Sequence, residues 1–156
     1  MPVRVQREDF DVGSEINALR GAKTHVGAVA SFIGTVRADA EGGTGNGVTA
    51  MTLEHYPGMT EKALEDICAQ AKSRWRVDDT LVIHRVGELK PADQIVLVVV
   101  TSSHRGDAFE ACAFIMDYLK TQAPFWKKEF TARGERWVEA RTRDDEQAAR
   151  WKPPGR

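Results

Sequence analysis

The fold is decided by the stretch IVLVVVTSS, residues 95–103, in which six apolar residues lead into three hydroxyl side chains. A run of this length and β-branched composition is typical of a strand buried on both faces, so it predicts the central strand of a sheet. A helix is expected to follow, from about Arg105 to Gln122, because apolar residues recur there at helical spacing. Its apolar stripe consists of Ala108, Cys112, Ile115 and Leu119.

Outward from these two elements, strand-like and helix-like patterns alternate along the chain. A short helix is expected at 14–19 with Ser14 as its N-cap, a longer helix at about 60–75, and a proline-containing turn at 88–93. Residues 38–47 (ADAEGGTGNG) are expected to form a flexible loop, because four glycines do not support regular structure. Strands are expected at 3–6, 27–37, 48–55, 80–86, 125–130 and 136–140. Two long helices among mixed strands predict an α+β sandwich, with helices on one face of a largely antiparallel sheet.

Composition predicts a cytoplasmic globular protein. The chain has 156 residues, 42% hydrophobic and 29% charged, which fits one domain over residues 1–151 with a frayed tail at 152–156. No apolar run approaches the roughly 20 residues needed to cross a bilayer, and the N-terminus lacks the apolar stretch of a signal peptide. Two cysteines without motif spacing favour a reducing compartment.

Positive charge concentrates near the C-terminus, where residues 120–156 hold 10 Lys/Arg against 6 Asp/Glu. Such a segment favours an anionic ligand, an acidic partner or nucleic acid, although it is also compatible with a solvated basic face. Cys68 and Cys112 fall on the apolar stripes of the two long helices, which indicates core packing rather than reactive thiols. The four histidines show no metal-binding spacing, so no metal or other cofactor is expected.

Two clusters carry candidate chemistry. In the first, Ser102-Ser103-His104-Arg105 begins a helix, where backbone N–H groups, an imidazole and a guanidinium can bind a phosphate or carboxylate. The alternative is that Ser103 is only an N-cap and Arg105 only a surface residue. In the second, Lys127 and Lys128 follow large aromatic residues, and Lys120 lies in the last turn of the helix before them. A lysine beside other cations and apolar walls has its charged form disfavoured and can accept a proton or act as a nucleophile.

The alternative for Lys120 is a simple interaction with the helix dipole. Phe32 and Arg37 would add an aromatic wall and another anion contact to the lysine cluster. On a helix, the 15 residues between Arg105 and Lys120 span roughly 22 Å, too far for one small substrate to reach both. Either the two clusters bind different ligands, or one site is assembled from two copies of the chain. We favour the second possibility, and hence a homodimer.

Seven motifs, in order along the chain, resemble those of the large, catalytic subunit of molybdopterin synthase. They are FIGTVR (32–37), LEHYPGM (53–59), HRVGEL (84–89), TSSHR (101–105), DYLK (117–120), PFWKKE (124–129) and RWVEAR (136–141). The resemblance covers about residues 1–151, and one departure is Ala92, where the family usually has glycine.

This resemblance implies an α/β hammerhead-type α+β fold with an added β subdomain. It also implies a homodimer flanked by two small ubiquitin-like sulfur carriers, which together make a heterotetramer. The implied reaction moves two sulfurs from thiocarboxylated Gly-Gly tails of the carriers to cyclic pyranopterin monophosphate, forming the molybdopterin dithiolene. No nucleic-acid or membrane partner is implied.

Carried over residue by residue, the resemblance also implies a site. The implied substrate pocket consists of Thr35, Val36, Arg37, His104, Arg105, Lys120, Lys127, Lys128 and Glu129, lined or closed by Phe32, Met116 and Arg141. Lys120 is expected to be the main catalytic group with Lys127 as its partner, while Arg37, His104 and Arg105 hold the phosphate. The alternative function is a non-catalytic module that binds a ubiquitin-like tail or nucleic acid through the same basic and aromatic surface.

Overall fold

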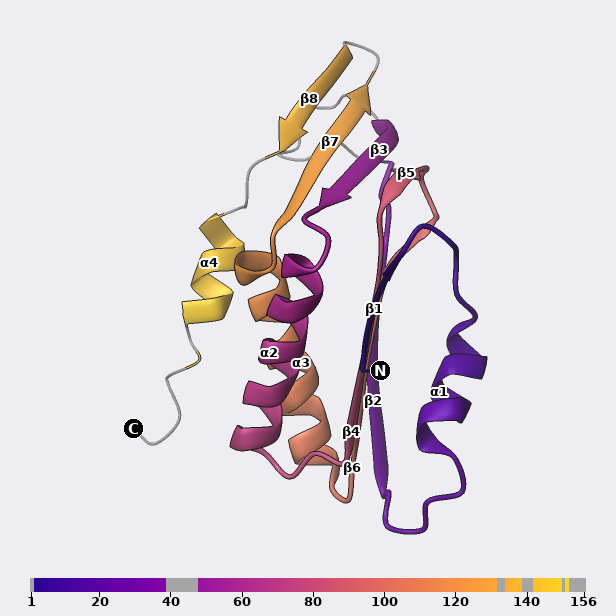
Figure 1. Cartoon of the computed structure of the whole chain (residues 1–156), viewed down its shortest axis with the longest axis vertical. Helices are drawn as coiled ribbons and strands as arrows, with labels where there is room; N and C mark the ends of the chain where they lie inside the picture. The colour runs from indigo at the N-terminus through magenta and orange to yellow at the C-terminus, as the bar shows by residue number, and fades with distance from the viewer. Residues whose placement is uncertain (1, 39–47, 132–133, 139–141, 150, 152–156) are drawn as a thin grey trace.

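The computed structural model describes residues 2–38, 48–131, 134–138, 142–149 and 151. Within these ranges it contains four helices and two four-stranded sheets (Figure 1). The strands are β1 (Val3–Gln6), β2 (Ala28–Thr35), β3 (Val48–His55), β4 (Asp79–Arg85), β5 (Gly87–Leu89), β6 (Gln94–Ser102), β7 (Phe125–Thr131) and β8 (Gly134–Val138). The helices are α1 (Val12–Arg20), α2 (Met59–Arg74), α3 (Arg105–Gln122) and α4 (Thr142–Ala149).

The first sheet has the strand order β1-β4-β6-β2. β6 pairs antiparallel with β4 on one side and β2 on the other, and its residues 96–100 are at most 2% exposed. The run of apolar residues therefore does form the central strand. Helices α2 and α3 cover one face of this sheet and bury Leu64, Ile67, Phe114 and Ile115 in the main core. β2 forms one edge of the sheet.

The second sheet has the order β5-β3-β7-β8 and extends beyond the ends of α2 and α3, as Figure 1 shows. Its core contains Met51, Leu53 and Leu89. Ile95 and Phe125 pack against this core and against the main core as well, so apolar contacts join the two sheets. This second sheet is the added β subdomain.

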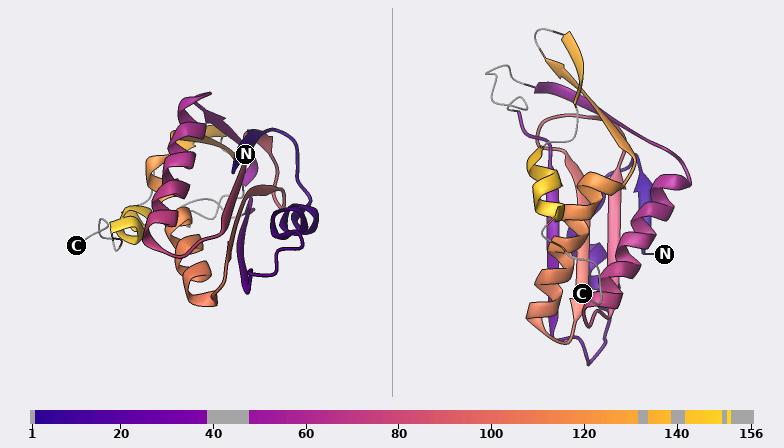
Figure 2. Two further views of the ribbon diagram at one scale, coloured as in Figure 1. Left: turned by 60° about the horizontal axis from the view of Figure 1, so that its bottom comes forward. Right: turned by 90° about the vertical axis from the view of Figure 1, so that its left-hand side faces the viewer.

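The α+β class and most of the expected elements are confirmed, and α3 begins and ends at the expected residues. The two long helices lie on one face of the first sheet, as expected, whereas the short helix α1 packs on the opposite face against Leu81 and Leu97 (Figure 2). α1 begins earlier than expected: its N-cap is Asp11, whose carboxylate accepts a hydrogen bond from the Ser14 N–H at 2.8 Å.

The sequence patterns also missed β5 and α4. Residues 39–47 of the expected flexible loop and the expected frayed tail at 152–156 lie outside the described residues. Of the helices described, none is long and apolar enough to span a membrane.

In the turn from Lys90 to Asp93, one alanine has a backbone conformation that is unfavourable for a residue with a Cβ atom. The Asp93 N–H donates to the Lys90 carbonyl at 2.9 Å, and Pro91 occupies the second position of the turn. Ala92, at the third position, has φ of 77°. A turn with proline second and positive φ third is type II, which favours glycine at the third position because a Cβ there is strained. The departure from the family pattern at Ala92 therefore carries a cost in stability.

We predict that Ala92→Gly stabilises the protein by about 0.5–1 kcal/mol, because relief of strain at positive φ exceeds the entropy that glycine adds to the unfolded chain. The measurement is denaturant unfolding at fixed protein concentration. The matched control is Ala18→Gly at an exposed position of α1, which should destabilise by up to about 1 kcal/mol. A destabilising Ala92→Gly would show that the turn is not strained.

Candidate active site

The first candidate cluster lies where β6 passes into α3. His104 is the N-cap of α3, in extended conformation (φ −130°, ψ 140°), and its imidazole makes no capping hydrogen bond. The alternative that Ser103 is the N-cap is therefore wrong. The side chains of His104 and Arg105 are both exposed at this end of the helix. An anion there would contact the imidazole, the guanidinium and the positive end of the helix dipole.

The second cluster lies at the opposite end of α3, where Lys120 is exposed in the last turn. Phe109, Met116 and Lys120 are spaced by seven and four residues, so they lie on one stripe of the helix. The other side of α3 is covered: Phe114 packs edge-on against Trp75 and Trp151, with ring centroids 5.4 Å and 5.6 Å away. The Lys120 stripe thus faces away from α2 and toward the side of the sheet where β2 forms the edge.

The two further lysines are held on β7, which follows α3 after a short connection. Lys127 and Lys128 are partly buried, and their backbone pairs with β3 at Leu53 and Thr52. The start of β7 is fixed to the first sheet, because the Phe125 ring stacks on the His84 imidazole with centroids 3.9 Å apart and planes 20° apart. This contact sets where the lysine-bearing strand begins relative to the end of α3.

His84 is a buried, neutral imidazole beneath this cluster. Its side chain is on β4, the residue is 5% exposed, and Nδ1 donates a hydrogen bond to the Arg85 carbonyl oxygen at 2.9 Å. The pKa of His84 is lowered to about 4, mainly by burial and to a smaller extent by the nearby charges of Lys120 and His55, against the opposing effect of the Arg85 carbonyl. The site therefore has an uncharged ring next to Lys120 at neutral pH. Sequence reasoning gave His84 no role, although an isolated histidine within a buried strand was a usable signal.

The end of β2 contributes the remaining expected residues. Phe32 and Thr35 are exposed on this strand, and Arg37 is exposed just after it. Val36 differs, because its side chain belongs to the core of the second sheet, its N–H donates to Asp93, and its carbonyl accepts from Ala92. Val36 therefore fixes the end of β2 and presents no unused group to a ligand.

The structure brings the expected residues together at two places. Thr35, Arg37 and Lys120 lie at the end of the first sheet from which β7 starts, with Met116 partly buried one turn away from Lys120. His104 and Arg105 lie at the far end of α3. The Glu129 side chain and all of Arg141 lie outside the described residues.

Neither cysteine belongs to these clusters. Both are buried free thiols, and burial raises the pKa of Cys68 and raises that of Cys112 to about 11. No group of three potential metal ligands occurs in the described part of the chain. The two clusters offer the side chains of lysine, arginine and histidine, together with backbone N–H groups.

Comparison with known proteins identifies the family of the chain. The family model described as MoaE protein matches residues 5–122. The chain belongs to the MoaE family. A molybdopterin synthase catalytic subunit from Ralstonia nicotianae is 63% identical over 149 residues, covering 96% of this chain and 83% of the relative. The family resemblance drawn from the sequence motifs is thereby confirmed, as is its assignment to a sulfur-transferring enzyme.

Solved structures of MoaE-family proteins share the fold. A molybdopterin biosynthesis MoaE protein from Burkholderia ambifaria MC40-6 has 57% identity and a TM-score of 0.81, covering 96% of each chain. A protein–protein complex of subunits 1 and 2 of the molybdopterin-converting factor from Helicobacter pylori 26695 has 18% identity and a TM-score of 0.73, covering 90% of this chain and 92% of that one. At this lower identity the likeness is one of fold.

The neutral state of His84 makes stability depend on pH. Its pKa is about 4 in the folded chain and near 6.5 when unfolded, so between these values only the unfolded state binds the proton. We predict that lowering the pH from 7.5 to 5 removes about 2 kcal/mol of stability through this residue. In denaturant unfolding at several pH values, His84→Gln should flatten the decline over this range. An equally steep decline in the variant would show that other groups cause it.

Proposed function

We propose that this chain is the sulfur-inserting subunit that converts cyclic pyranopterin monophosphate into molybdopterin. The observation that carries the proposal is the position of Lys120, at the end of α3 between the exposed end of β2 and the lysine-bearing strand β7. An anionic phosphate and an anionic sulfur donor both suit this cationic surface. The enzyme needs no thiol of its own, since the sulfur comes from a thiocarboxylate on the carrier.

Sulfur insertion can be written as a balanced sequence. The thiocarboxylate sulfur attacks a carbon of the pterin side chain and forms a carbon–sulfur bond, while the carbon–oxygen bond at that carbon breaks. The displaced oxygen leaves either on the phosphate, which opens the cyclic phosphate, or protonated as water. Water then cleaves the acyl–sulfur bond, which releases the carrier as a carboxylate and leaves the sulfur on the substrate. We assign Lys120 to assist the attack or to transfer a proton, with Lys127 as its partner near the pterin. Proton transfer by a positioned group of this kind accelerates reactions by about 10²–10⁴.

The substrate site is assembled from two copies of the chain. The support is the outer edge of β2, which no strand of the described residues covers. Large apolar side chains are exposed around it: Val29 (37%), Phe32 (43%), Ile33 (38%) and Phe109 (66%). An open strand edge with apolar side chains is suited to pairing with an identical edge about a twofold axis.

Antiparallel pairing of two β2 edges has a geometric consequence for the site. β2 runs from Ala28, next to Ser102, to Thr35, next to Gln94. Pairing with the reverse direction therefore places the Thr35 end of one copy beside the Ala28 end of the other. His104 and Arg105 of the second copy then approach Arg37 and Lys120 of the first. Arg37, His104 and Arg105 would hold the phosphate while Lys120 and Lys127 act on the pterin.

The proposed partner is a small ubiquitin-like carrier, which makes a heterotetramer with the homodimer. Its anionic C-terminal tail would be drawn to the lysine cluster, and charge complementarity mainly raises the rate of association. The Helicobacter pylori complex of two converting-factor subunits is consistent with such a pairing. We place the reaction in the cytoplasm, where both buried cysteines would remain reduced.

We predict that Lys120→Ala lowers product formation by about 10²-fold or more, because it removes the group that is proposed to assist sulfur attack or to transfer a proton. The measurement is a reconstitution with thiocarboxylated carrier and cyclic pyranopterin monophosphate, followed by fluorescence of the oxidised dithiolene product. The control is Lys62→Ala, an exposed lysine on α2, which should retain wild-type activity.

Two results would count against the proposal. Near-normal turnover by Lys120→Ala would refute the role of this residue. Carrier binding without any product from the wild-type chain would favour the alternative, a module that recognises the carrier tail without catalysis.

A further inference from the structure

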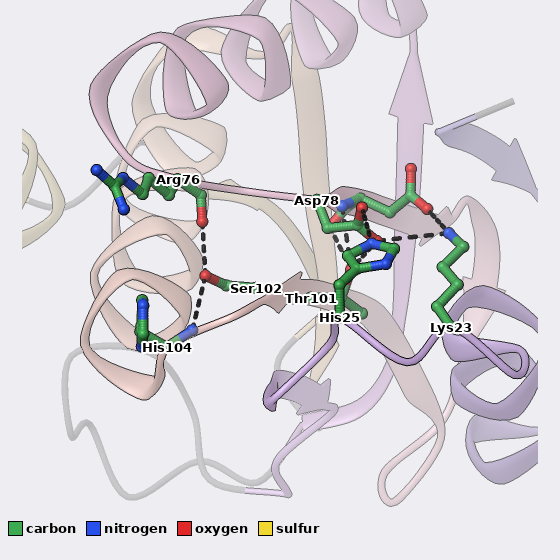
Figure 3. A network of polar contacts seen from close by, with 8 residues as sticks. Lys23, His25, Arg76, Asp78, Thr101, Ser102 and His104 are labelled. Carbon is green, nitrogen blue, oxygen red and sulfur yellow. Dashed lines mark hydrogen bonds and ion pairs between the residues drawn. The ribbon is translucent and has the colours of Figure 1, made fainter.

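A network of polar contacts lies beneath the start of α3 and has no part in the function described so far. It joins three segments that are far apart in the sequence: 23–27, 76–79 and 101–104 (Figure 3). The third of these segments ends at His104, the N-cap of α3. The network is therefore attached to the backbone that carries the His104 and Arg105 side chains.

Ser102 is the centre of the part nearest to the helix. The residue is fully buried, its hydroxyl donates a hydrogen bond to the Arg76 carbonyl oxygen at 2.6 Å, and its Oγ accepts one from the His104 N–H at 3.2 Å. Figure 3 shows the Ser102 side chain between these two backbone groups. One hydroxyl thus links the β6–α3 turn to the segment that follows α2.

Gly27 supports the same turn from another side. Its N–H donates to the Ser102 carbonyl at 2.9 Å, and a Cβ on Gly27 would lie 2.4 Å from the Ser103 carbonyl oxygen. Only glycine fits at this distance without a shift of the turn. The backbone at Ser102 and Ser103 is therefore constrained both by a side-chain bridge and by close contact with the chain before β2.

The outer part of the network fixes the neighbouring segments. Thr101 Oγ1 accepts the Asp79 N–H at 3.0 Å and donates to Asp78 Oδ2 at 3.2 Å, while His25 Nε2 donates to Asp78 Oδ1 at 2.8 Å. The hydrogen bond from His25, with help from the charge of Lys23, holds the pKa of Asp78 below its usual value. Asp78 thus remains an acceptor that joins segments 23–27 and 76–79.

We propose that Ser102 is a positioning residue for the phosphate contacts of His104 and Arg105. This inference rests on the proposed function, in which those two side chains hold the phosphate of the substrate. Removal of the hydroxyl leaves the Arg76 carbonyl and the His104 N–H without their common partner, so the turn relaxes. A small displacement at the start of the helix moves the side chains of both His104 and Arg105. Phosphate binding is weakened as a result, while Lys120 at the other end of the helix stays in place.

The test is a comparison of KM and kcat for the pterin substrate in Ser102→Ala, together with the inhibition constant of inorganic phosphate as a competitor. We expect KM and the phosphate inhibition constant to rise together, by about 5–10-fold, with kcat within about twofold of wild type. The matched control is Ser73→Ala on α2, where the hydroxyl also donates to a backbone carbonyl, that of Gln70 at 2.7 Å, but away from the site. It should leave all three constants unchanged.

Gly27→Ala gives an independent variant, because it displaces the Ser103 carbonyl without removing the Ser102 hydroxyl, and the same separation of KM from kcat is expected. It decides the question if Ser102→Ala does not fold. Arg105→Ala distinguishes a failure of the positioning role from a failure of the proposed phosphate site. If Arg105→Ala raises KM and the phosphate constant whereas the folded turn variants do not, the positioning role is overturned. If Arg105→Ala changes neither constant, the proposed phosphate site itself fails.

Discussion

The structure depends on the packing of α3 along β6, which fixes two cationic groups at opposite ends of one rigid helix. The helix has 18 residues and is held by a fully buried side, so its ends stay roughly 25 Å apart. A small phosphorylated substrate does not bridge that distance within one chain. In the proposed dimer, a twofold axis at the exposed edge of β2 would bring opposite ends of two helices together. Assembly of the site and assembly of the dimer would then be the same event.

A second constraint sets the local chemistry around Lys120. The stacked pair of His84 and Phe125 joins the first sheet to the strand that carries Lys127 and Lys128. Burial keeps the imidazole uncharged, so the ring contributes shape and an apolar surface without adding positive charge to a group of lysines. A protonated histidine at this position would repel the neighbouring Lys120. The acid sensitivity of His84 is the cost of a buried ring that orients the site.

Much of the fold could be predicted because the strongest signals were local. The apolar run of β6 and the helical stripe of α3 specify their own structure, and α3 was placed to the residue. β5 was missed because three residues before the proline turn are too few to show a strand pattern, and its pairing with β3 depends on a distant segment. The position of α1 on the opposite face also has no local signal, since it depends on contacts with Leu81 and Leu97. The cationic residues of the site could be recognised from the sequence by residue type. The supporting roles of His84 and Ser102 could not, because these roles depend on contacts between distant strands and turns.

We propose that each site draws on two copies of the chain, and the decisive experiment mixes two impaired variants at a substrate concentration where each alone has little activity. Arg105→Ala and Lys120→Ala would be dissociated, mixed in equal amounts, reassociated and assayed for dithiolene product. Random exchange makes half of the dimers mixed, and each mixed dimer has one site with both residues intact. We therefore predict that the reassociated mixture has about a quarter of wild-type activity. No recovery, with exchange of copies verified, would show that Arg105 and Lys120 do not act in a shared site.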